Sequence, residues 1–114
     1  MKLNDLNISD AQIVEICSTT QNFKITLKDW LAKEWLITFY DTLALQDFNI
    51  VGEELSHINI ECEDVLKSEV LDHFVDEDKE KYLCFNFFGV WSDKALLKVV
   101  AADDYEIVEK VSPD

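Results

Sequence analysis

Carboxylates dominate the side chains of this protein that could do chemistry, and their spacing first suggests a metal site. Asp76, Asp78 and Glu80 stand at alternate positions, as ligands do at the start of a calcium-binding loop. Such a loop also needs a glycine at its sixth position and a bidentate glutamate at its twelfth, where Lys81 and Phe87 stand instead. The sequence therefore predicts that calcium does not bind here.

The histidines and glycines form no other metal or catalytic pattern. His57 and Cys62 lack a second pair of ligands at zinc-site spacing, so we expect a structural or exposed histidine. His73 follows Asp72 directly, and neighbouring residues on a helix point apart, so the two cannot act as a catalytic dyad. The two glycines are isolated and form no phosphate-binding loop. We expect no catalytic residue, no metal and no cofactor, and a protein that is not an enzyme.

The acidic residues are concentrated in one part of the chain. Residues 61–80 hold nine carboxylates and two lysines, a net −7 out of −14 for the whole chain. One interpretation is a solvated surface that keeps the protein soluble. The other is a docking face for a basic partner, since concentrated charge of one sign is self-repelling and needs a reason. The candidate partner-binding residues are Glu61, Glu63, Asp64, Glu69, Asp72, Asp76, Glu77, Asp78 and Glu80.

The overall charge excludes several kinds of partner. The chain has 10 basic residues, all of them lysine, against 24 acidic ones. Such a protein is repelled by phosphate, so we expect it to bind neither nucleic acid nor an anionic membrane surface. The absence of arginine also removes the usual bidentate clamp for phosphate and carboxylate ligands. The partner we expect is a protein.

Length and composition predict one globular domain over residues 1–114. The chain is 48% hydrophobic and has seven Phe, three Trp and three Tyr, enough for one core. Its longest uncharged stretch, residues 82–92, is far shorter than the roughly 20 residues needed to span a bilayer. The first residues include Asp5 and lack the apolar core of a signal peptide. The three cysteines are an odd number without a Cys-x-x-Cys pair, which is typical of reduced thiols in a cytoplasmic protein.

Alternation of apolar and polar residues predicts most of the secondary structure. Period-two patterns indicate strands at residues 23–28, 35–40, 58–62, 82–88, 95–101 and 105–110. The four residues between the first two strands suit a hairpin connection. Ile37 and Phe85 lie on the apolar faces of their strands, so we expect both in the core. We expect the three tryptophans in the core or at its rim.

Three further segments complete the prediction. Residues 9–18 combine a capping box with a β-branched run, so we favour a strand and keep a helix as the alternative. Leu66, Val70 and Phe74 share one face of a helix predicted over residues 63–74. Residues 41–55 follow neither period and are predicted as a loop with a helical turn. The expected fold is therefore α+β and β-rich, an antiparallel sheet of about six strands with one or two short helices.

Several runs give the chain a family resemblance. The chain resembles small bacterial immunity proteins in its strand order, length and acidity. The resemblance also rests on Leu27-Lys28-Asp29-Trp30, Ile37-Thr38-Phe39-Tyr40-Asp41, Phe48 and Gly52-Glu53-Glu54-Leu55. Such immunity proteins are the antidotes of polymorphic toxin and contact-dependent growth inhibition systems, and the resemblance covers residues 11–101. It implies a cytoplasmic protein that neutralises one cognate basic toxin domain, such as a nuclease, without doing chemistry. We expect a monomer rather than a dimer. The resemblance transfers no functional residue position by position.

The charge is consistent with that implication, because opposite charge raises association rates well above the ~10⁵–10⁶ M⁻¹s⁻¹ of uncharged pairs. The alternative is an acidic secretion chaperone that holds an effector segment on an apolar surface. A dimer with a long apolar groove would indicate the chaperone, and a monomer with a compact acidic face would indicate the immunity protein.

Overall fold

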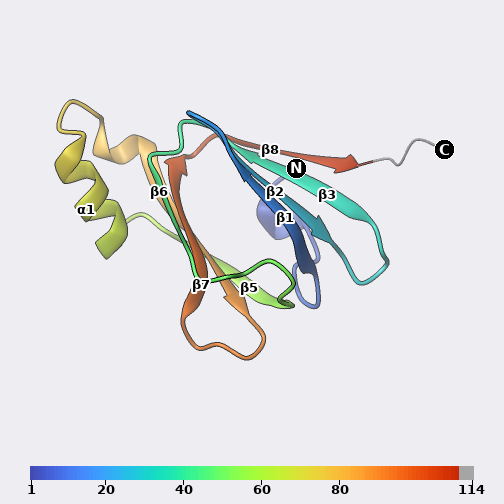
Figure 1. The fold of residues 1–114 in the computed structure, drawn as a ribbon. Coiled ribbons are helices and arrows are strands. Elements are labelled where there is room, and N and C mark those ends of the chain that lie inside the picture. The colour runs from blue at the N-terminus through green and yellow to red at the C-terminus, as the bar shows by residue number, and fades with distance from the viewer. Residues whose placement is uncertain (111–114) are drawn as a thin grey trace.

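The computed structural model describes residues 1–110, which form two four-stranded antiparallel sheets and one α-helix (Figure 1). The first sheet has the order β1 (Gln12–Ser18), β2 (Phe23–Lys28), β3 (Glu34–Phe39) and β8 (Tyr105–Lys110). The second has the order β4 (Ala44–Asp47), β7 (Ala95–Ala102), β6 (Tyr82–Gly89) and β5 (Leu55–Glu61). The helices are α1 (Val65–His73) and the 3₁₀ turns η1 (Leu3–Asp5) and η2 (Lys79–Lys81). Residues 111–114 of the predicted domain lie outside the described residues.

The predicted strand-rich α+β class is confirmed, but the prediction of a single sheet of about six strands is wrong. The chain passes between the sheets twice at one corner, from β3 to β4 and from β7 to β8. The two crossings lie side by side, since Tyr40 N donates to Asp104 O at 3.4 Å and Ala102 N donates to Tyr40 O at 3.3 Å. The alternation of apolar and polar residues is the same on both sides of such a corner. It therefore predicts the number of strands but not the sheet to which each strand belongs.

The core lies between the two sheets. Ile25, Ile37 and Phe39 from the first sheet and Phe85 and Phe87 from the second are fully buried in one cluster. The rings of Phe39 and Phe85 meet with centroids 4.8 Å apart. The predicted core positions of Ile37 and Phe85 are therefore confirmed. The N-terminal segment completes this cluster with Leu3, Leu6 and Ile8.

Two of the less regular segments resolve into strands. Residues 12–18 form β1, which confirms the strand interpretation over the helix, with a bulge between Ile13 and Glu15. The prediction for residues 41–55 is wrong in part, because they include β4. That strand is only four residues long and pairs with β7, with Leu45 packed against the core and Gln46 exposed. A strand this short gives too few alternations to be recognised from sequence.

The predicted helix over 63–74 is present as α1 and covers part of the outer face of the second sheet (Figure 1). Asp64 caps it by accepting a hydrogen bond from Leu66 N at 2.8 Å. The helix contributes to a second buried cluster, which comprises Leu71, Tyr82, Cys84, Val100 and Ala102. The predicted apolar face is wrong at Phe74, which is 43% exposed, because the helix ends at His73 and the chain turns away there.

The prediction for the tryptophans holds only for Trp35. This side chain is half-buried against the core and donates its Nε1 hydrogen to Asp29 Oδ2 at 3.1 Å. Trp30 and Trp91 are 62% and 92% exposed, because both lie in the turns between strands rather than in the strands. Among residues 1–110, no helix is long and apolar enough to cross a membrane.

Candidate functional site

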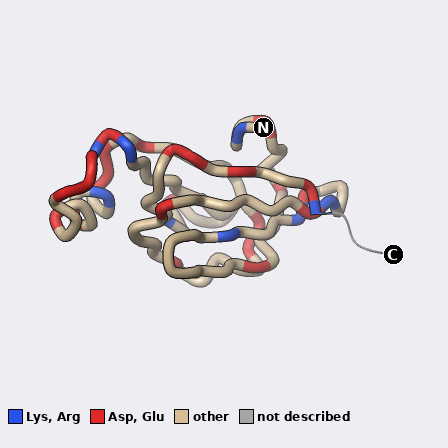
Figure 2. The backbone as a smooth tube through the Cα atoms, turned by 90° about the horizontal axis from the view of Figure 1, so that it is seen from above, with Lys and Arg blue, Asp and Glu red and all other residues tan. Residues whose placement is uncertain are grey.

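The acidic segment, residues 61–80, runs from the end of β5 through α1 to η2 on the outside of the second sheet. Figure 2 shows its acidic positions at one end of the molecule, away from the first sheet. Eight of the nine carboxylate residues predicted to bind a partner are exposed, and Asp64 is half-buried. The nine residues therefore lie on one continuous segment at the surface of the second sheet. Their role in binding stays a prediction.

Asp64 differs from the other eight because it is part of the packing of the helix. Lys98 Nζ lies 2.9 Å from Asp64 Oδ2 and 3.2 Å from Asp64 Oδ1, so β7 is joined to the start of α1. Burial alone would raise the pKa of the Asp64 carboxyl, but the hydrogen bonds from Lys98 and from Leu66 N outweigh it and hold that pKa below 3.8. The ionised carboxylate thus stabilises the fold.

We expect Asp64→Asn to lower the free energy of unfolding by about 1.5–3 kcal/mol near neutral pH. The amide keeps an oxygen for the helix cap and loses the charge that faces Lys98, a charge-assisted hydrogen bond. Because the folded-state pKa is lower than the unfolded one, this contribution is present above pH 3.8 and is lost as pH falls through the folded pKa. Urea unfolding of both proteins over an acidic pH series measures it. A difference that stays constant at the lowest pH values would contradict the assignment.

Two more carboxylates of the acidic segment have structural roles. Glu77 Oε2 accepts a hydrogen bond from the Tyr82 hydroxyl at 3.0 Å, and Asp78 Oδ1 accepts one from Glu80 N at 3.0 Å at the start of η2. Burial, followed by the bond to Glu77, raises the pKa of Tyr82. The remaining six carboxylates make no side-chain hydrogen bond or ion pair within residues 1–110. They are Glu61, Glu63, Glu69, Asp72, Asp76 and Glu80.

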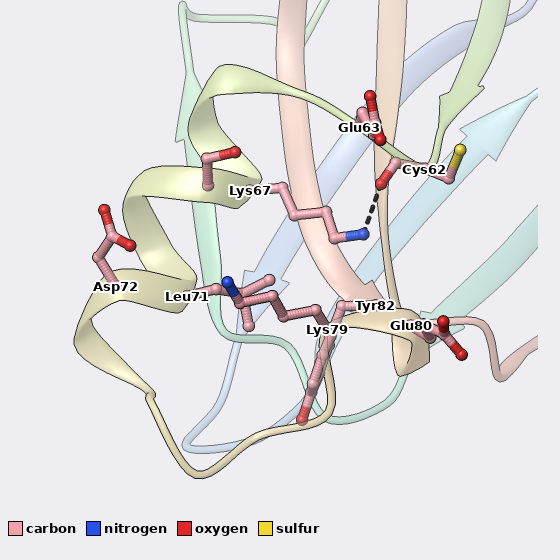
Figure 3. A pocket seen from close by; sticks show the side chains of 9 residues that line it. Cys62, Glu63, Lys67, Leu71, Asp72, Lys79, Glu80 and Tyr82 are labelled. Carbon is pink, nitrogen blue, oxygen red and sulfur yellow. Dashed lines mark hydrogen bonds between the residues drawn. The ribbon is translucent and has the colours of Figure 1, made fainter.

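A cleft of about 660 Å³ opens between α1 and η2, in the middle of the acidic segment (Figure 3). Its apolar lining comes from Leu71 and the ring of Tyr82. Three of the six unpaired carboxylates, on Glu63, Asp72 and Glu80, lie around it. A cleft that combines apolar surface with carboxylates suits a side chain with an aliphatic stem and a cationic end.

Lys67 closes the inner side of this cleft. Its side chain is 8% exposed and reaches across to donate a hydrogen bond to the backbone carbonyl of Cys62 (Figure 3). This bond joins the first turn of α1 to the end of β5. Lys79 also lines the cleft, so its charge is mixed, with three carboxylates against two ammonium groups.

Within residues 1–110, no group of three or more His, Cys, Asp or Glu side chains could hold a metal ion. Cys17 and Cys62 are exposed and unpaired, and burial followed by the charge of Asp64 raises the pKa of Cys84 to about 12. His57 lies within β5 and stacks on Phe88, with centroids 4.4 Å apart.

Searches for similar proteins give no match among protein-family models, curated proteins or solved structures. The resemblance to immunity proteins therefore stays a prediction that rests on this sequence alone.

Sequence reasoning found the carboxylates and missed the residues that organise them. Lys67 and Tyr82 line the cleft, and Lys98 holds the start of α1. One signal was available for Lys98, a lone charge in the otherwise apolar strand 95–102. Its partner could not be read from the sequence, because the two residues are 34 positions apart.

Proposed function

We propose that this protein is a non-catalytic immunity protein that binds and neutralises a cognate basic toxin domain, such as a nuclease, in the cytoplasm. The observation that carries the proposal is the group of six exposed carboxylates on the acidic segment that make no side-chain hydrogen bond or ion pair within residues 1–110. A metal site would require a group of ligands that is not found within residues 1–110. The alternative, a solvated surface that keeps the protein soluble, predicts instead that these charges do not affect binding.

The exposed carboxylates would speed the association of this protein with a cationic toxin domain. Exposed charges of one sign act mainly on the diffusional encounter and raise the association rate with a cationic partner. Lys98 and Lys67 are held by Asp64 and the Cys62 carbonyl. Neither is therefore free to swing out and neutralise the carboxylates. An antidote must act before its toxin does, so a fast encounter is the property that the proposal requires.

The cleft between α1 and η2 supplies a place for a short-range contact in the same surface. A lysine or arginine side chain of the toxin domain would lay its stem on Leu71 and Tyr82 and bring its charge to Glu63 or Glu80. Anchors that fill a pocket at the centre of an interface contribute most of the binding energy. Charges at the rim contribute mostly to rate and specificity.

Co-expression in bacteria tests the proposal. The probe is the carboxyl-terminal domain encoded by the gene immediately upstream of this one, expressed with and without this protein. We expect the domain alone to arrest growth, co-expression to restore it, and the two purified proteins to form a 1:1 complex. The control is a toxin domain of similar positive charge from another system, which should stay toxic. Growth arrest that this protein does not relieve would contradict the proposal.

A further inference from the structure

We propose that a second copy of this chain pairs with the open edge of β8, which no strand within residues 1–110 covers. The two β8 strands would run antiparallel about a twofold axis at Val108, and two four-stranded sheets would become one sheet of eight strands. This inference goes beyond the proposed function and does not depend on it. The sequence led us to expect a monomer, because an open edge can be recognised only once each strand is placed in its sheet.

β8 differs from the other three edge strands because it lacks their protection. The first sheet ends in β1 and β8, and the second ends in β4 and β5. β1 and β5 each carry a bulge, and β4 is only four residues long. Bulges and short strands are ways in which proteins prevent edge-to-edge pairing. β8, by contrast, keeps an unbroken register with β3 over six residues.

The backbone bonds of the first sheet show which groups of β8 are open. Asp29 N donates to Lys33 O at 2.8 Å in the turn from β2 to β3, so the odd-numbered residues of β3 bond to β2 and the even-numbered ones face β8. The register pairs even-numbered residues of β3 with even-numbered residues of β8. The N–H and C=O groups of Tyr105, Ile107 and Glu109 therefore point to the open edge. Within residues 1–110, no backbone group bonds to them there.

A twofold axis at Val108 makes this edge complementary to itself. Ile107 then lies opposite Glu109 of the second copy, so the unbonded backbone groups of the two strands meet. Glu106 lies opposite Lys110 of the second copy, and the symmetry repeats this pair. Opposite charges that face each other across antiparallel strands attract, and they are closer at positions without backbone bonds. The strand is therefore complementary in both its backbone and its charges.

The charges across the outer face of the first sheet also alternate in sign up to this edge. Three charged side chains occupy neighbouring register positions on β2, β3 and β8, namely Lys28, Glu34 and Lys110. Glu106 of the second copy would take the next position and continue the alternation. The adjacent row ends in Val108, which is 42% exposed and would be covered by its own counterpart.

The net charge of the chain does not prevent a contact at this end of the molecule. β2, β3 and β8 together carry three lysines and three glutamates. β8 runs away from α1, and the acidic segment lies at the opposite end of the molecule (Figures 1 and 2). Charges are screened over ~8 Å at physiological ionic strength, so the two acidic segments would repel each other only weakly across the dimer. Both segments would also stay exposed to a partner.

Sedimentation velocity of the full chain at physiological salt tests the inference. We expect a monomer at about 10 µM and a growing fraction of dimer toward about 500 µM, because a contact between two six-residue edges is smaller than the ~1,200 Å² of a stable interface. Hydrogen exchange gives a second measure on the unchanged protein. The amides of Ile107 and Glu109 should exchange more slowly as the concentration rises, because they become bonded in the dimer.

Two charge reversals test the pairing of Glu106 with Lys110. We expect Glu106→Lys and Lys110→Glu each to weaken dimerisation about tenfold, because like charges would then face each other at both symmetric positions. An equal mixture of the two variants should dimerise as well as the unchanged protein, since every facing pair is again of opposite charge. Glu106 also accepts a hydrogen bond from the Tyr40 hydroxyl, but Lys110→Glu keeps that bond. A variant that failed to fold would not regain association on mixing.

Glu15→Lys is the matched control for Glu106→Lys. Glu15 is exposed on β1, at the opposite edge of the same sheet, and both substitutions change the net charge from −14 to −12. The control should dimerise like the unchanged protein. A chain that stays monomeric up to about 500 µM, at which even a weak contact of this size should form, would overturn the inference, also if β8 then pairs with a strand of a toxin domain. A dimer that neither reversal weakens, or a mixture that stays monomeric, would place the contact on another surface and overturn it as well.

Discussion

Replacing Phe85 by alanine should lower the free energy of unfolding by about 3–5 kcal/mol, the loss expected when a fully buried aromatic ring is deleted. The ring is completely buried and contacts Phe39 and Tyr105, with centroids 4.8 Å and 5.7 Å away. These contacts join the two sheets, because Phe39 belongs to β3 and Tyr105 to β8. Neither sheet can move into the space left by the ring without losing its other contacts, so most of the cavity should remain.

Equilibrium unfolding in urea measures the effect. Val75→Ala is a suitable control, since Val75 is 81% exposed in the loop after α1, and we expect it to change stability by less than about 0.5 kcal/mol. A loss below about 1 kcal/mol for Phe85→Ala would mean that the ring does not lie in the core. An intermediate loss accompanied by a changed urea dependence would instead indicate that the sheets unfold separately.

The sequence predicted the strands well because most of them alternate over six or more residues. The run 23–28 coincides with β2, and 105–110 coincides with β8. The pairing between strands could not be predicted in the same way. Whether β8 lies beside β3 or beside β7 depends on a bend at residues 103–104, and that bend leaves the alternation on either side unchanged. Local pattern therefore defines elements, and long-range contacts define the sheets.

In the candidate site, too, the sequence predicted the residues but not the contacts that they make. The sequence identified the concentration of charge in residues 61–80 but treated its nine carboxylates as equivalent. In the structure Asp64, Glu77 and Asp78 hold the chain in place through bonds to Lys98, Tyr82 and Glu80. The bond of Asp64 spans 34 positions, whereas those of Glu77 and Asp78 join residues five and two positions apart, and none of the six other carboxylates makes such a bond within residues 1–110. A mutation that reverses all of the charge would therefore disturb folding and docking together.

The separation of roles defines a cleaner test of the docking face. In this test lysine replaces four carboxylates that make no side-chain hydrogen bond or ion pair within residues 1–110, namely Glu63, Asp72, Asp76 and Glu80. Each reversal adds two positive charges, so the net charge changes from −14 to −6. We expect association with the cognate toxin domain at low salt to become about 10–100-fold slower, because electrostatic steering accounts for rate differences of that size. Thermal stability should change little, since Asp64, Glu77 and Asp78 are retained.

A second variant with the same net charge shows whether the position of the charge matters. It carries lysine at four exposed positions outside the acidic segment, namely Glu15, Glu53, Asp93 and Glu109. Stopped-flow association of both variants at two salt concentrations is the measurement, because exposed charges are screened over ~8 Å at physiological ionic strength. We expect the control to associate several-fold faster than the first variant at low salt, and the two rates to converge at high salt. Equal rates for the two variants at low salt would mean that total charge alone attracts the partner. Rates equal to that of the unchanged protein would make the acidic segment a solvated surface and would place the docking face elsewhere on the chain.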